Sequence, residues 1–252
     1  INGGTVTDAD VTYASGNITG GIMGGFGISG AVSDNHVTVT NATIGGIYPT
    51  VYGGHSTSNN VTGNTVTIAS DNNDLDVCGG HTASGNAGGT GEGEGNTVTI
   101  TGGNMGSVYG GYSGSGEVKN NKVYISGGAY GGAAVYGGYG GDTGEVSGNA
   151  VEVSGENTYI NNIIYGGYSE NGNAGGTGDG NTVIISGGKV GGSGYGGYAQ
   201  LDATGNKVNI SGTATTVTGG VYGGQAKTGR ADYNQVIISG GTIEFLNIYS
   251  SL

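Results

Sequence analysis

Three histidines and a single cysteine are the side chains of this 252-residue chain best suited to metal binding. His55 and His81 occupy equivalent places in two related segments, whereas His36 stands apart from both. Two stacked imidazoles could begin a zinc site, but the sequence shows no further ligands near them. We therefore expect these two histidines to replace aromatic residues in a stack, with a metal pair as the alternative. Cys78 has no second cysteine as a partner, so we expect a small buried apolar residue.

Acidic residues in the loops form a second candidate set, for calcium. The segment Gly137–Asp142 partly matches the calcium-binding pattern Gly-Gly-x-Gly-x-Asp, but it does not recur every nine residues as that motif does. A solvated acidic surface is the favoured interpretation, and calcium binding remains a minor alternative. The loop carboxylates in question are Glu92, Glu94, Asp142, Glu145, Asp179 and Asp202.

Nucleotide and nucleic-acid binding are both disfavoured. Gly192–Gly197 satisfies Gly-x-Gly-x-x-Gly, but no strand–helix–strand unit surrounds it. Six Lys and Arg residues against 18 Asp and Glu residues give a formal net charge of −12, which repels a phosphate backbone. We expect no nucleic-acid partner.

A polysaccharide lyase or hydrolase is the strongest enzymatic alternative, because parallel β-helices often carry such sites on an outer face. Catalysis needs carboxylates, or carboxylates with Lys or Arg, gathered on consecutive coils. Glu152 is predicted to point outward, but its expected stack neighbours are Tyr124 and Ile184, which carry no carboxylate. We therefore predict no enzyme, no catalytic residues, no bound metal and no cofactor.

An ice-binding face is a further alternative. The segments Thr65–Thr67 and Thr97–Thr99 both read Thr-Val-Thr, and regular arrays of threonine would suit that function. Lys122–Tyr124 and Ala150–Glu152 interrupt the array, which makes this the weaker hypothesis.

The elements that must position these residues follow from a repeat. The pattern Asn-x-Val-x-Ile, with Val as a variant of Ile, recurs along the whole chain at a spacing typical of repeat architectures. The alternating apolar residues predict strands with one buried face. We expect each leading Asn to occupy a corner in the left-handed backbone conformation, which Asn tolerates. These asparagines are Asn35, Asn64, Asn96, Asn121, Asn149, Asn181, Asn206 and Asn234.

A second segment follows each of these strands and reads Val-Tyr-Gly-Gly-Tyr in its commonest form, as in Val108–Tyr112 and Val135–Tyr139. Stacking in register would place like residues about 4.8 Å apart, in ladders of aromatic rings and of Asn. The glycine pairs fit sharp corners or close backbone approach. Met23–Phe26 is a diverged copy, and the longer repeats carry the related insertions Asn86–Gly91 and Asn173–Gly178.

Together these patterns predict one all-β domain over residues 1–252, a parallel β-helix of about nine coils with about 25–32 residues each. The intervals 32, 25 and 28 recur in order, so the chain also has an 85-residue period of three coils. A three-sided, prism-like solenoid that stacks equivalent positions at this 85-residue period is the alternative.

Strings such as Gly95–Ile100 followed by Val108–Ser113 resemble the Gly-rich repeats of bacterial autotransporter passenger domains and related surface adhesins. The resemblance covers about residues 17–249. It implies a piece of a longer, exported chain at the bacterial cell surface or outside the cell, with a structural or adhesive function. The implied partners are a host surface glycan or protein, or neighbouring copies of the chain. Membrane insertion by this segment is not expected.

Overall fold

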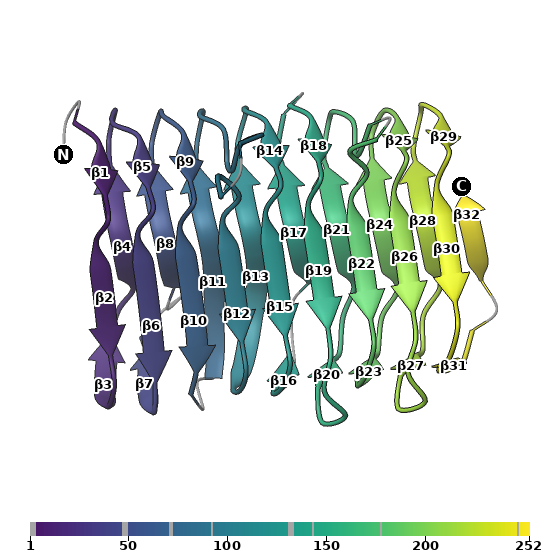
Figure 1. The fold of residues 1–252 in the computed structure, drawn as a ribbon, viewed down its shortest axis with the longest axis horizontal. Helices are drawn as coiled ribbons and strands as arrows, with labels where there is room; N and C mark the ends of the chain where they lie inside the picture. Colours follow the sequence, from purple (N-terminus) through teal and green to yellow (C-terminus); the bar gives the residue numbers. More distant parts are fainter. Residues whose placement is uncertain are drawn as a thin grey trace.

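The chain forms a β-solenoid whose coils stack side by side along one axis (Figure 1). In this computed structural model, all strand pairs are parallel, and the described residues contain no helix. It follows that no described segment forms an apolar helix of membrane-spanning length. The structure describes residues 4–46, 50–70, 73–91, 93–130, 134–142, 144–176, 178–245 and 247–252.

One long sheet, here called the first face, carries the alternating Val and Ile residues. Val66 pairs with Val37 on one side and with Val98 on the other, so each coil stacks on the next one in sequence. Equivalent positions therefore meet one coil apart, and the alternative of stacking at the 85-residue period is wrong. The nine strands in order are β2 (Asp10–Tyr13), β6 (His36–Thr40), β10 (Thr65–Ala69), β12 (Thr97–Ile100), β15 (Lys122–Ile125), β19 (Ala150–Val153), β22 (Thr182–Ile185), β26 (Lys207–Ile210) and β30 (Gln235–Ile238).

A second sheet, the aromatic face, carries the Gly-Gly segments. Its long strands are β4 (Ile22–Gly27), β8 (Thr50–Ser56), β11 (Asn73–Thr82), β13 (Asn104–Ser113), β17 (Val135–Gly140), β21 (Ile164–Ser169), β24 (Gly194–Ala199), β28 (Val221–Ala226) and β32 (Ile248–Ser251). A row of short strands branches from β13 in the same sheet: β16 (Ala129–Tyr130), β20 (Tyr159–Ile160), β23 (Lys189–Val190), β27 (Thr216–Val217) and β31 (Thr242–Ile243).

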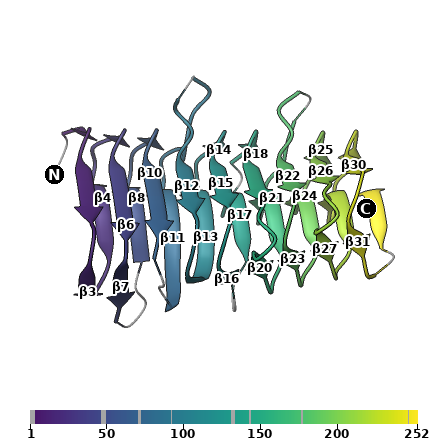
Figure 2. The ribbon, with the colours of Figure 1, turned by 60° about the horizontal axis from the view of Figure 1, so that its bottom comes forward.

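Short strands, with single bridges at Ala87 and Ala174, close the remaining side of the coils. They are β1 (Val6–Thr7), β5 (Val32–Ser33), β9 (Val61–Thr62), β14 (Val118–Lys119), β18 (Val146–Ser147), β25 (Ala203–Thr204) and β29 (Ala231–Asp232), while β3 (Gly16–Thr19) pairs with β7 (Ala42–Gly45) at the opposite edge. Two long loops project from the body before β12 and β22, where the related insertions lie (Figure 2). These two coils are three apart, so the 85-residue period is a repeated block of three coils.

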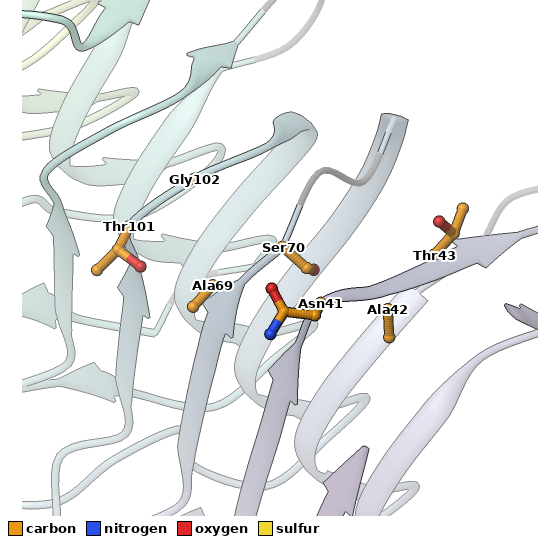
Figure 3. Close-up of a pocket in the computed structure, with 7 residues that line it drawn as sticks. All are labelled: Asn41, Ala42, Thr43, Ala69, Ser70, Thr101 and Gly102. Carbon is orange, nitrogen blue, oxygen red and sulfur yellow. The ribbon is translucent and has the colours of Figure 1, made fainter. Parts of the chain in front are cut away.

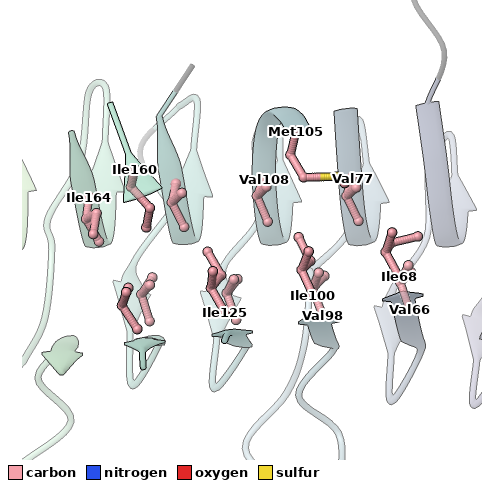
Figure 4. Packing of buried hydrophobic residues seen from close by; sticks show 14 of the residues in the cluster. Val66, Ile68, Val77, Val98, Ile100, Met105, Val108, Ile125, Ile160 and Ile164 are labelled. Atoms are coloured by element: carbon pink, nitrogen blue, oxygen red, sulfur yellow. The ribbon is translucent and has the colours of Figure 1, made fainter. Parts of the chain in front are cut away.

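The core lies between the first face and the aromatic face. Val98 and Ile100 point inward from the first face toward Met105 and Val108 of the aromatic face, and all four are fully buried (Figure 4). The prediction that the Val and Ile pairs are buried is confirmed for the coils from Val37 to Ile210. It is wrong for the last pair: Val236 is half-buried and Ile238 is 41% exposed, because no later described coil stacks on β30.

Candidate functional site: the aromatic face

The repeated Asn residues form a continuous ladder inside the solenoid. The Oδ1 atom of Asn121 accepts hydrogen bonds from the backbone N–H and the Nδ2 of Asn96, at 3.0 and 2.9 Å. Its Nδ2 donates to the backbone oxygen of Ala87 and to Oδ1 of Asn149. The same links recur from Asn35 to Asn234. The ladder therefore satisfies buried polar groups at one corner of every coil.

The left-handed conformation does not fall on the ladder asparagines, contrary to the expectation from sequence. It falls on the residue before them in six coils, for example at Asp34 (φ 55°), Asn120 (φ 58°) and Tyr233 (φ 57°). The preceding residue makes the turn, and the ladder Asn keeps a negative φ and a buried side chain.

The glycine pairs lie directly over this ladder. A Cβ atom on Gly111 would lie 2.5 Å from Cγ of Asn121, and one on Gly110 would overlap the backbone oxygen of Gly137 in the next coil. Neither glycine has a positive φ angle. Of the two roles predicted for these glycines, close approach is therefore correct and a sharp corner is not.

The residues that flank each glycine pair lie on the outer side of the sheet and build two columns, mostly of aromatic rings, in which Cys78 is itself buried. The first column contains Met23, Tyr52, Cys78, Tyr109, Tyr136, Tyr165, Tyr195, Tyr222 and Tyr249, in the order of the strand register. The second contains Phe26, His55, His81, Tyr112, Tyr139, Tyr168, Tyr198 and Gln225. The predicted ladders are confirmed.

Rings within a column are parallel, and rings of the two columns are nearly perpendicular. Tyr109 and Tyr136 have centroids 5.0 Å apart and planes 2° apart, whereas Tyr136 and Tyr139 meet at 88°. Rings that repeat about every 4.8 Å reach face contact at roughly 3.5 Å when they tilt by about 45°. If the two columns tilt in opposite directions, the plane of a ring in one column makes an angle near 90° with the plane of a ring in the other. The columns pack as a herringbone, with both offset-stacked and edge-to-face contacts.

Burial raises the pKa of eight column tyrosines, namely Tyr52, Tyr109, Tyr112, Tyr136, Tyr139, Tyr165, Tyr168 and Tyr195. The cause is desolvation of the phenolate, to which neighbouring phenols add, as at Tyr136 and Tyr165. The hydroxyl of Tyr139 also donates to a carboxylate oxygen of Glu170. Desolvation is again the largest cause of its raised pKa, followed by the hydrogen bond from the phenol to that carboxylate and its charge. The face therefore keeps neutral phenol groups that can donate and accept hydrogen bonds.

The two histidines lie in the second column, as predicted. His81 stacks on His55 at 4.8 Å and on Tyr112 at 4.6 Å. Burial, followed by the nearby His55, lowers the pKa of His81 to about 4. Among the described residues, no three His, Cys, Asp or Glu side chains lie close enough to hold a metal ion. His36 lies on the first face and meets the Thr65 hydroxyl.

Three of the acidic loop residues, Glu94, Glu145 and Asp202, contact their neighbours through their carboxylates. Lys119 lies between Glu117 and Glu145, with nitrogen–oxygen distances of 3.2 and 3.3 Å. Glu94 accepts a hydrogen bond from the backbone of Gly91, and Asp202 accepts one from the backbone of Arg230. The main-chain N–H groups of Asp142 and Asp179 donate to backbone oxygens, and Glu92 lies outside the described residues.

The first face places Glu152 between Tyr124 and Ile184, as predicted from the repeat. Its threonines form a longer column than expected, in which Thr12, Thr38, Thr67 and Thr99 follow one another before Tyr124 ends the run.

One hollow in the described surface has a volume of about 460 Å³ and lies at a bend of neighbouring coils (Figure 3). It is lined by Asn41, Ala42, Thr43, Ala69, Ser70, Thr101 and Gly102. None of these side chains titrates near neutral pH, so the hollow offers no group for general acid or base catalysis.

The aromatic face, with its two columns of stacked aromatic residues, is therefore the candidate functional surface. Comparisons with protein-family models, curated proteins and solved structures found no match.

Proposed function

We propose that this chain is a rigid segment of a bacterial cell-surface or secreted fibre, acting as a stalk or adhesin through its aromatic face. The observation that carries the proposal is the pair of ring columns along one side of a continuous solenoid. No catalytic step is needed for this function.

The solenoid suits a spacer because each coil shares its core and hydrogen bonds with its neighbours. Nine coils at about 4.8 Å each give a body roughly 40 Å long. A negative net charge of −12 favours solubility and disfavours contact with anionic membranes. The resemblance to Gly-rich adhesin repeats supports the location at the cell surface.

The aromatic face suits adhesion because half-buried tyrosines combine apolar area with hydroxyl groups. Tyrosine is enriched at protein interfaces for this reason. Each ring is held by its column, so binding costs little side-chain entropy. Because the rings stack on one another, a partner meets mainly ring edges and hydroxyls. This geometry favours hydrogen-bonding partners such as a glycan or a protein surface.

The test is a binding screen of the purified segment against host glycans and surface proteins. The variant Tyr139→Ser with Tyr168→Ser is expected to lose binding, whereas Tyr124→Ser on the first face is the matched control and is expected to retain it. Equal loss in both variants, or binding confined to another part of the parent protein, would leave only the stalk function. Cytoplasmic localisation of the parent protein would refute the surface assignment.

A further inference from the structure

One ring is missing from the first aromatic column. Cys78 occupies the place between Tyr52 and Tyr109, and its side chain is too small to fill the space of a tyrosine. A notch of about 260 Å³ opens there, lined by Tyr52, Asp76, Cys78, His81, Tyr109 and Tyr112.

The rings on both sides of the notch keep their column positions. Tyr52 stands at 72° to His81, and Tyr109 stands at 89° to Tyr112, as column rings do elsewhere. Two coils separate the two tyrosines, so their centroids are about 10 Å apart and their tilted planes are about 7 Å apart. One planar ring needs about 3.5 Å on each face. The notch is therefore one ring thick.

A hydrogen-bonding group lies where the hydroxyl of the missing ring would fall. The side chain of Thr50 lies near the hydroxyl of Tyr52, and that of Ser107 lies near the hydroxyl of Tyr109, in each case two residues earlier in the strand. The corresponding residue in the Cys78 coil is Asp76, which pairs with Thr50 in the strand register. Asp76 thus replaces a hydroxyl with a carboxyl group at the end of the notch.

The carboxyl group of Asp76 is incompletely solvated. One oxygen accepts the backbone N–H of Ser107 at 2.6 Å, and burial raises the pKa of this carboxyl group. His81, on another wall, has a buried Nδ1 atom without a hydrogen-bond partner. A ligand that brings a hydrogen-bond donor to Asp76 would compensate part of this desolvation.

We propose that the notch at Cys78 binds one planar phenolic ring, stacked between Tyr52 and Tyr109 with its hydroxyl donating to Asp76. The ring belongs either to a free phenol or to a tyrosine side chain of a partner. This site does not depend on the cell-surface function proposed above. The thiol of Cys78 takes no part in the chemistry, since its Sγ donates to the oxygen of Gly80 and burial raises its pKa.

The test is calorimetric titration of the whole chain with p-cresol, the side-chain analogue of tyrosine. A ligand of this size is expected to bind with a Kd of about 1 mM. Toluene lacks the hydroxyl and should bind about tenfold more weakly, and Asp76→Ser should abolish this difference. Nuclear Overhauser contacts from bound p-cresol to the rings of Tyr52 and Tyr109 should locate the ligand.

Two variants separate the notch from the rest of the face. Cys78→Tyr restores the column and should lose p-cresol binding while retaining its circular dichroism spectrum. Tyr136→Cys opens a second notch between Tyr109 and Tyr165, so it should raise the stoichiometry to about two. The new notch should accept toluene and p-cresol equally, because Ala134 stands there in place of Asp76. If Cys78→Tyr fails to fold, this second variant still decides the question.

The two sources of the ring are distinguished by the blocked tripeptides Gly-Tyr-Gly and Gly-Phe-Gly. Preference for the tyrosine peptide at an affinity near that of p-cresol assigns the site to a partner's side chain. Loss of peptide binding with retention of p-cresol assigns it to a free phenol. Absence of p-cresol binding to the wild-type chain, or equal binding to Cys78→Tyr, would overturn the proposal.

Discussion

We predict that Gly111 is needed for stability because the Asn121 side chain lies beneath it. A double-mutant cycle can measure the free energy of this contact. Gly111 lies in an extended strand with no positive φ angle, so alanine introduces no backbone strain there. Its Cβ atom, however, would lie 2.5 Å from both Cγ and Nδ2 of Asn121. Because the ladder holds Asn121 in place, we expect Gly111→Ala to lower the free energy of unfolding by about 3 kcal/mol.

Asn121→Ala should cost a similar amount for a different reason. The change removes the acceptor for the backbone N–H of Asn96, which has no other hydrogen bond among those of the described residues. The oxygen of Ala87 is less affected because it still accepts the N–H of Lys119. One orphaned buried N–H group and the cavity left by the amide together cost about 3 kcal/mol.

The double variant should cost less than the sum of the single variants. With the amide gone, the Cβ atom at position 111 enters empty space. The double variant should therefore lose about 2 kcal/mol less unfolding free energy than the sum of the two single variants. Urea unfolding followed by circular dichroism measures all four corners of the cycle. Gly111→Ala with Asn206→Ala is the control, because Asn206 contacts Gly197 instead. Additivity within about 0.5 kcal/mol in the Gly111–Asn121 cycle would refute this explanation of the glycine.

Three further changes test other parts of the structure. Gly194 stands in the inward column between Ile164 and Val221 with nothing within 4 Å of its Cβ position, so Gly194→Val should stabilise the chain by about 2 kcal/mol in urea unfolding. Since the pKa of His81 falls from 6.5 to about 4 on folding, the unfolded chain takes up a proton first as the pH falls. The wild type should therefore lose about 3 kcal/mol between pH 6.5 and 4, and His81→Tyr should lose less over the same range. Ile125→Asp buries an unpaired charge and should cost on the order of 4 kcal/mol in thermal unfolding, whereas Tyr124→Asp, at a position 37% exposed, should be tolerated; equal effects would reject the inward assignment.

The strands can be predicted from the local sequence, because inward apolar and outward residues alternate between direct neighbours. Val123 and Ile125 point inward and Tyr124 points outward, as a period of two requires. The stacking interval is harder to predict, since coils three apart are as similar in sequence as adjacent ones. The hydrogen-bond register between strands determines which coils stack on each other. That register depends on the lengths of the loops between strands that are far apart in the sequence.

The notch at Cys78 could have been found by comparing the repeats with one another. The sequence pattern identifies Cys78 as a replacement within a ring column but draws no attention to the unusual residue two places earlier. Asp76 pairs with Thr50 in the strand register and, like Ser107, stands two residues before the column position, so one coil loses a ring and gains a carboxyl group together. The herringbone angle lies beyond prediction, because it depends on side-chain tilt rather than on residue spacing.

The glycine pair links the interior of the solenoid to its aromatic surface. In a regular strand, residues three apart point to opposite faces, yet Tyr109 and Tyr112 both point outward. The two glycines between them absorb this irregularity, and the same two lie against the Asn ladder and the backbone of the next coil. A side chain at either position would therefore disturb the ring columns as well as the core. The Asn of one segment and the Tyr-Gly-Gly-Tyr of the other form one structural unit, which explains why they recur together along the chain.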